Sequence, residues 1–306
     1  YIAKKLKATP TLLIMAAVIL LDLWTIDRRY LNDSHFQKKQ ASEIYPSDID
    51  LAILQDPDPN YRVFNASTNT FNESMTSYFH KSIGGYSPAK LRRYQDIIDY
   101  HLSRRINPKV LNMLNAKYFI VPSQAGGGVQ LNEAALGNAW FVDDWQWVET
   151  PNAEIEALYT FEPAQTAVVH EEFRALFPAE AADLSADTTG IERTIRLTAY
   201  KPNYLAYHSE NEHDELAVFS EIYYPKEWTA YIDGKEVPHF RANYVLRALW
   251  IPAGVHEIEF RHTPYHFALW RNVANIGSLL VGLILVGAIA GYVLIARKQR
   301  QNPTAA

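Results

Sequence analysis

The chain has 306 residues, of which 48% are hydrophobic and 21% are charged, and this composition excludes a wholly disordered or collagen-like protein. Its net charge of -5 argues against binding to duplex nucleic acid, because such binders carry a basic excess that displaces counterions. The sequence contains no cysteine, which excludes a disulfide framework, a thiolate zinc site and a cysteine nucleophile. Because of its acidic net charge, we expect the protein to have no nucleic-acid partner.

The first apolar segment runs uncharged from Ala8 to Leu21 and reaches Ile26 when Asp22 is included. Fourteen residues suit an interfacial segment, whereas the nineteen residues of the longer segment are enough to span a bilayer. Lysines precede it and no small-residue cleavage site follows, so it lacks the layout of a signal peptide. We expect residues 1–30 to form a transmembrane helix with a cytoplasmic N-terminal flank. Because the chain starts at Tyr1, we also expect it to be a C-terminal piece of a longer polypeptide.

Asp22 is the acidic residue inside this first helix, near its expected outer end. One interpretation places its carboxylate at the level of the lipid headgroups, beside Trp24. The other makes it a buried polar contact with further helices, since acids inside a membrane are costly and usually have a function. The sequence leaves both open.

The last apolar segment, Ile276 to Ala296, contains 21 uncharged residues. At about 1.5 Å per residue it matches the ~30 Å hydrocarbon core of a bilayer. Arg297, Lys298 and Arg300 follow it, so residues 269–306 are expected to form a C-terminal transmembrane helix with a basic cytoplasmic tail. With lysines before the first helix as well, both termini lie in the cytoplasm and residues ~30–270 on the extracytoplasmic side.

Residues 31–185 are expected to form a mixed α/β extracytoplasmic domain. Ser87 and Pro88 are suited to the N-cap and first position of a helix whose apolar residues extend to Leu102. A loop is expected at 124–128. The other expected elements are strands at 59–64, 117–121 and 140–142 and a short acidic helix at 152–158.

In residues 186–268 the apolar pattern changes to a period of two, which predicts an antiparallel β-sandwich. Asp233-Gly234 is the strongest turn signal, since a type I′ hairpin needs positive φ at both residues. The expected strands include 216–224, 228–232, 235–240, 246–250 and 255–261. The fold class expected for the whole chain is therefore α+β and membrane-anchored: a mixed α/β domain, then an antiparallel β-sandwich, flanked by two transmembrane helices.

Two polar segments are candidate sites. The run from His208 to Glu215 contains two imidazoles and four carboxylates that could hold a divalent ion, but its place between strands favours a solvated turn. The run from Asp143 to Trp147 combines acids with indole rings, as a sugar subsite would. Because adjacent strand residues point to opposite faces, we favour a turn with packed tryptophans.

Trp228 and Tyr231 form a third candidate, as a platform on which a sugar would stack. Their spacing of three puts them on opposite faces of a strand unless a bulge intervenes, so we expect Trp228 to be packed in the sandwich. Gly234 and the turn at 252–254 are expected to be structural. We assign no catalytic, cofactor-binding or metal-binding residue, and we expect no cofactor.

Several stretches of the sequence resemble the bacterial membrane protein family YfhO. They cover most of the chain in the family's order, and a terminal membrane helix follows them. The stretches are Ile83-Gly84-Gly85-Tyr86, Leu114–Val121, Gly137–Val142, Tyr223-Tyr224-Pro225 with Trp228–Lys235, Arg241-Ala242-Asn243-Tyr244, and Pro252-Ala253-Gly254 with His256.

The resemblance implies a multi-pass protein of the bacterial inner membrane, related to the GT-C glycosyltransferases. Such enzymes transfer a sugar from a polyprenyl-phosphate donor, here to an envelope glycan. Their acidic catalytic residue lies in an early outer loop, and no residue of this sequence inherits that role. The chain is thus expected to be an extracytoplasmic accessory region of such a protein. The alternative is a non-enzymatic membrane-anchored scaffold or glycan-binding domain.

Overall fold

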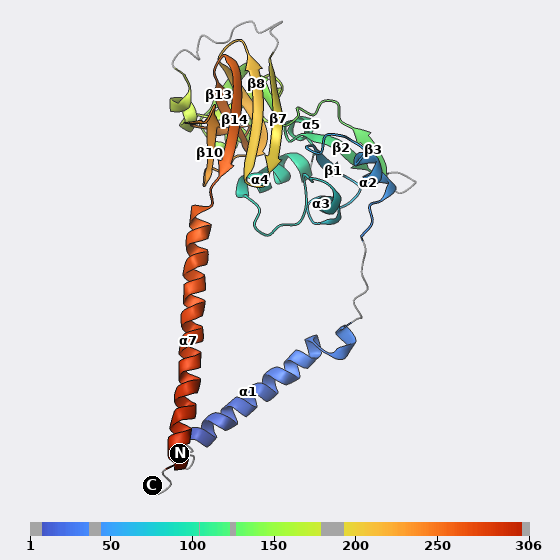
Figure 1. Ribbon diagram of the computed structural model, residues 1–306. Coiled ribbons are helices and arrows are strands. Elements are labelled where there is room, and N and C mark those ends of the chain that lie inside the picture. The colour runs from blue at the N-terminus through green and yellow to red at the C-terminus, as the bar shows by residue number, and fades with distance from the viewer. Residues whose placement is uncertain (1–7, 37–43, 104, 123–126, 179–192, 302–306) are drawn as a thin grey trace. The chain divides into compact units, whose positions relative to one another are not determined.

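The computed structural model describes residues 8–36, 44–103, 105–122, 127–178 and 193–301 (Figure 1). The chain divides into two compact units, Tyr1–Pro46 and Ser47–Ala306. The first unit contains the long helix α1 (Ala8–Tyr30) and a 3₁₀ turn, η2 (Asp33–His35). The second contains three sheets, several short helices and the long helix α7 (Tyr265–Gln301).

Both long helices are exposed along their apolar length. Among the described residues, the two segments apolar and long enough to cross a membrane are Thr9–His35 and His266–Lys298, with mean hydropathies of 1.9 and 2.7. Neither is buried against the rest of the protein, as the core helix of a soluble protein would be. The predicted pair of apolar helices at the two ends of the chain is confirmed.

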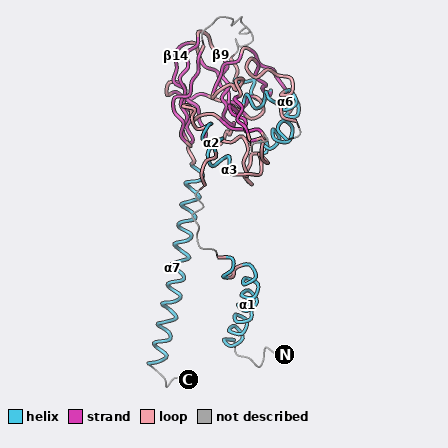
Figure 2. Tube along the Cα trace, turned by 90° about the vertical axis from the view of Figure 1, so that its right-hand side faces the viewer, coloured by secondary structure: helices cyan, strands magenta, loops and turns pink. Residues whose placement is uncertain are grey.

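Within the described residues, fourteen strands form three sheets. Figure 2 colours the strands magenta. The first has the order β1-β2-β3, the second β4-β9-β13-β12-β6-β5, and the third β11-β10-β14-β8-β7. All pairings in the third sheet are antiparallel, whereas β1–β2 and β5–β6 are parallel. The strands are β1 (Arg62–Asn65), β2 (Ala116–Val121), β3 (Gly128–Leu131), β4 (Ala139–Val142), β5 (Asp144–Val148), β6 (Thr166–His170), β7 (Thr194–Lys201), β8 (Tyr204–Asn211), β9 (Glu215–Ile222), β10 (Trp228–Ile232), β11 (Lys235–Val237), β12 (Phe240–Ala242), β13 (Leu246–Ile251) and β14 (Gly254–His262).

The six-stranded sheet is buried on both faces. One face shares an apolar cluster with the five-stranded sheet, including Phe219 and Leu249 from the six-stranded sheet and Tyr207 and Phe260 from the five-stranded sheet. Its other face packs against short helices through a larger cluster. The helical elements here are α2 (Asp48–Ile53), α3 (Met75–Phe79), α4 (Arg92–Ile97), a π-helix η3 (Ile98–Ser103), α5 (Pro108–Met113), α6 (Pro151–Ala157) and a 3₁₀ helix η4 (Glu171–Leu176).

The three-stranded sheet is attached to the six-stranded sheet through Arg62. Its guanidinium donates to Ser220 Oγ at 2.8 Å and forms an ion pair with Glu221 at 3.0 Å, both on β9. The six-stranded sheet also takes strands from both sides of the boundary expected between residues 185 and 186. That boundary itself, like most of the loop expected at 124–128, lies outside the described residues.

Several expected elements are confirmed and four are corrected. The helix expected from Ser87 begins only at Arg92, because residues 84–91 are not helical and form only a short turn at 88–89. The run at 235–240 is two strands, β11 and β12, which belong to different sheets. Residues 144–148 form a strand rather than a turn, and residues 208–211 continue strand β8. In the three strand cases the pairing partner decides the local conformation.

Candidate functional site

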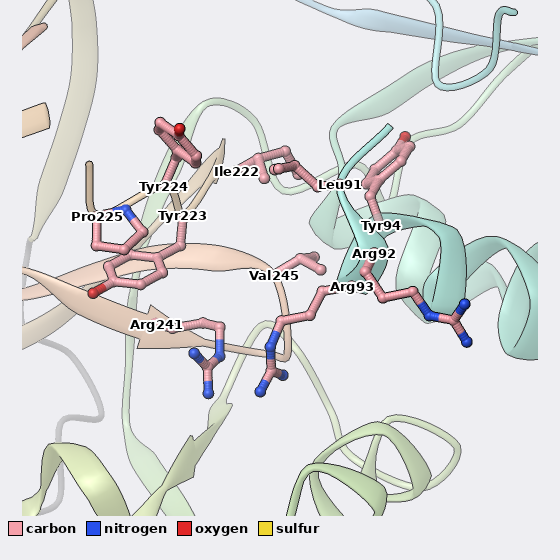
Figure 3. A pocket seen from close by; sticks show the side chains of 10 residues that line it. All are labelled: Leu91, Arg92, Arg93, Tyr94, Ile222, Tyr223, Tyr224, Pro225, Arg241 and Val245. Carbon is pink, nitrogen blue, oxygen red and sulfur yellow. The ribbon is translucent and has the colours of Figure 1, made fainter. Parts of the chain in front are cut away.

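An apolar cavity lies where β9 ends, beside the start of α4 (Figure 3). It has a volume of about 280 Å³ and is hereafter called the groove. Three arginines and no acid contribute to its wall. The lining residues are Leu91, Arg92, Arg93, Tyr94, Ile222, Tyr223, Tyr224, Pro225, Arg241 and Val245.

Two chain turns shape one side of the groove. Tyr223 continues the pairing of β9 by donating its N–H to the carbonyl of Val245 at 2.7 Å, before Pro225 ends the run. The β12–β13 turn holds Asn243 and Tyr244 at φ of 49° and 69°. Asparagine tolerates that region, and Asn243 is fixed there because its side chain accepts from the N–H of Val168 at 2.8 Å. The turn thus places Tyr244 and Val245 against α4.

An ion network joins two of the groove's arginines to Glu154, which does not itself line the groove. Glu154 is 0% exposed and receives Arg93 Nη1 at 2.9 Å and Arg241 Nε at 3.3 Å. In Figure 3 the guanidinium groups of Arg93 and Arg241 lie side by side, whereas that of Arg92 points away from the cavity. Arg241 also pairs with the half-exposed Glu172 at 2.7 Å. Such a network is stable because each buried charge has a hydrogen-bonded partner.

The position of Glu154 follows from the residues that start helix α6. Thr150 caps α6 by accepting from the N–H of Ala153, and Pro151 occupies the first turn. These features start the helix so that Glu154 and Ile155 face inward. Above the network, the guanidinium of Arg93 lies 4.4 Å from the ring centroid of Tyr244. Burial and the hydrogen bond to Asp96 raise the pKa of the Tyr244 hydroxyl to about 12, so it stays protonated.

A second buried cation lies behind the groove. Arg247 is 3% exposed, donates to the carbonyl of Ile222 at 3.1 Å, and lies 4.1 Å from the ring centroid of Trp228. Burial lowers the pKa of Arg247. Burial, helped by the charge of Arg247, also lowers the pKa of His239 to about 4. His239 is therefore neutral at pH 7.

Strand directions place the groove at the α7 end of the molecule. The turn at 252–254 joins the end of β13 to the start of β14, so β14 runs back toward α7. β9 is antiparallel to β13, and Leu246, the first residue of β13, lies opposite Ile222. The groove therefore opens at the end of the sheets from which α7 departs. Glu227, two residues after Pro225, contacts both Thr263 and His266 at the start of that helix.

The structure separates Trp228 from Tyr231. Trp228 is half-buried and packs against the cluster shared by the two larger sheets. Tyr231 lies between the buried Ala230 and Ile232, so its ring faces the opposite side of β10 under Arg261, 4.3 Å away. The two rings do not form one stacking platform.

The residues of the other two candidate segments also have separate partners and do not converge on one site. In the run from Asp143, Trp145 packs on Trp250 and Phe177, while Asp143 pairs with Arg193. In the run from His208, that histidine pairs with Glu257 at 2.7 Å, and Glu215 pairs with Arg193. Within the described ranges, no group of three or more His, Asp or Glu side chains is arranged to hold a metal ion.

The groove was not predicted from the sequence, although two of its segments lie in stretches that resemble the family. Tyr223-Tyr224-Pro225 and Arg241-Ala242-Asn243-Tyr244 both stood out for the family resemblance. Arg93 and Glu154 carried no such signal, and only the packing of α4 and α6 brings them to Arg241.

The fold and the two apolar helices define a membrane-associated α+β protein with a head of three sheets. Residues 179–273, from before β7 into α7, match the family described as "Bacterial membrane protein YfhO", which confirms the resemblance seen in the sequence. Comparison of the chain with curated proteins and with solved structures finds no match.

Proposed function

We propose that this chain is the extracytoplasmic accessory region of a multi-pass membrane protein that modifies cell-envelope glycans with lipid-linked sugars. The observation that carries the proposal is the family match over the strands that lead directly into α7. The two larger sheets, which share one apolar cluster and pair mostly antiparallel, serve in this proposal as a β-sandwich held at the membrane.

The proposed topology has both termini in the cytoplasm of a bacterial cell and residues ~30–270 outside its inner membrane. Basic residues flank both helices on the side assigned to the cytoplasm: lysines before α1, and Arg297 and Lys298 near the end of α7. Reporter fusions at residue 150 and after Ala306 test this arrangement. An active periplasmic reporter is expected at the first position and an active cytoplasmic reporter at the second, and the reverse pattern would overturn the topology.

The glycan role is tested by comparing envelope glycans of wild-type and deletion cells. A missing sugar modification in the deletion strain, restored by the intact gene, supports a sugar transferase. Unchanged glycans contradict it and favour the alternative, a non-enzymatic scaffold or glycan-binding domain. In either case the membrane-associated head is the part described here.

A further inference from the structure

We propose that the groove binds the phosphate headgroup of an anionic lipid of the bilayer in which the chain is anchored. The proposal rests on the membrane anchoring in the proposed function, but not on its sugar chemistry or its sidedness. Location, charge and shape each support it.

The first support is location. α7 departs from the same end of the sheets at which the groove opens, and its early residues Phe267 and Trp270 are each 65% exposed. Aromatic side chains at the start of a membrane helix mark the headgroup region. Glu227 fixes the start of α7 to the loop that follows Pro225, so the groove wall lies only two residues along the chain from this anchor. Two extended residues span at most about 7 Å, so Pro225 in the groove wall lies within about 7 Å of Glu227, which contacts the start of α7.

The second support is charge. Arg93 and Arg241 present adjacent guanidinium groups, and they share one carboxylate, that of Glu154. The further acid on Arg241, Glu172, has a side chain that is half exposed and does not line the groove. A guanidinium has five N–H donors in a planar fork, so each arginine keeps donors beyond those its carboxylates use. This arrangement matches the oxygens of a phosphate.

The third support is shape. The wall opposite the arginines is apolar and aromatic and includes Leu91, Tyr224 and Pro225. Leu91 and Tyr224 are 41% and 37% exposed, so the groove presents apolar and aromatic surface beside the arginines. A cavity of about 280 Å³ holds a headgroup but not a whole lipid. The apolar wall would then contact the glycerol and the first acyl carbons.

The test uses the full chain in phosphatidylcholine nanodiscs that contain a photoreactive phosphatidylglycerol, with the reactive group near the carboxyl end of one acyl chain. Mass spectrometry then maps the labelled peptides. Labelling is expected at residues 91–94, 222–225 and 241–245, and a phosphatidylcholine probe with the same reactive group is expected to label these peptides weakly.

Paired variants separate charge from shape. Tyr224→Glu is expected to reduce labelling about fivefold, the factor equivalent to ~1 kcal/mol for one charge near a lipid surface, whereas Tyr224→Lys retains it. Arg93→Gln is expected to reduce it similarly. Arg196→Glu is the matched control, because this exposed residue lies on β7 opposite His208, toward the end of the sheets away from α7. Its labelling should equal that of the wild type.

Three results would overturn the proposal. The first is equal labelling by the neutral and anionic probes, and the second is an equal loss in Tyr224→Glu and Tyr224→Lys. The third is displacement of the lipid probe by inorganic phosphate at similar concentration, which would make the groove a site for free phosphate. If labelling holds while the reporter fusions give the reverse topology, the proposed function fails and the lipid site stands.

Discussion

The carboxylate of Glu227 accepts a hydrogen bond of 3.0 Å from the backbone N–H of His266, in the first turn of α7. The carbonyl of Glu227 also accepts from the N–H of Thr263 at 2.8 Å. Glu227 makes these contacts with φ at 69°, a conformation that is costly for a residue other than glycine. One residue of the head thus caps the long apolar helix α7.

Replacing Glu227 by alanine is expected to loosen the start of α7. Loss of a capping side chain costs about 1 kcal/mol, which corresponds to roughly fivefold faster amide exchange. Hydrogen exchange of the full chain in nanodiscs should show this increase at residues 263–268 and not within β9. Unchanged protection at those amides would show that the cap contributes nothing to the junction.

Replacing Glu154 by glutamine is expected to destabilise the head by about 3 kcal/mol, the lower end of the range for a broken buried pair, since Arg93 loses its carboxylate and Arg241 keeps only Glu172. Urea unfolding of the full chain in detergent, followed by tryptophan fluorescence, measures the change. Glu156→Gln is the control, because Glu156 lies in the same helix but is exposed. An equal, small effect for both variants would contradict the structural role of the network.

Replacing Gly234 by valine is expected to cost more than about 1 kcal/mol through backbone strain. The positive φ of both Asp233 (51°) and Gly234 (77°) confirms the expected type I′ hairpin. No atom lies within 4 Å of a Cβ added at Gly234, so the cost comes from φ alone. Gly234→Asn should therefore be much milder in thermal unfolding, and equal losses for the two variants would exclude this explanation.

Replacing Trp228 by alanine is expected to cost about 3 kcal/mol, the lower end of the range for a large aromatic ring, because the side chain is only half-buried. Part of the loss comes from Arg247, a buried cation that would lose the ring lying 4.1 Å from its guanidinium. Trp228→Phe should recover much of the stability. If Trp228→Ala leaves the melting temperature unchanged but abolishes glycan binding, Trp228 is a binding residue and the packing interpretation is wrong.

Acidification is expected to destabilise the head through His239. Its pKa is about 4 in the folded protein, below the ordinary value of 6.5, because burial disfavours the charged ring. The unfolded chain therefore binds a proton more readily, and the stability due to the neutral ring, present above pH 6.5, is lost as pH falls from 6.5 toward 4. His239→Phe should flatten this part of the stability profile, and a profile identical to that of the wild type would refute the assignment.

The sequence by itself determined the features that depend on neighbouring residues. The length of the apolar runs predicts α1 and α7, and the Asp233-Gly234 pair predicts its hairpin, because span length and turn geometry are local properties. The opposite facing of Trp228 and Tyr231 likewise follows from the period of a strand. The tertiary structure decided which strands share a sheet and which side chains meet in the groove. Strand β13 is buried on both faces, against the five-stranded sheet on one side and against short helices on the other. The alternation of its residues predicts a strand, but it does not predict what covers either face. Glu154 meets Arg241, 87 positions away, only because α6 and the β12–β13 turn pack together, and no local pattern encodes that contact.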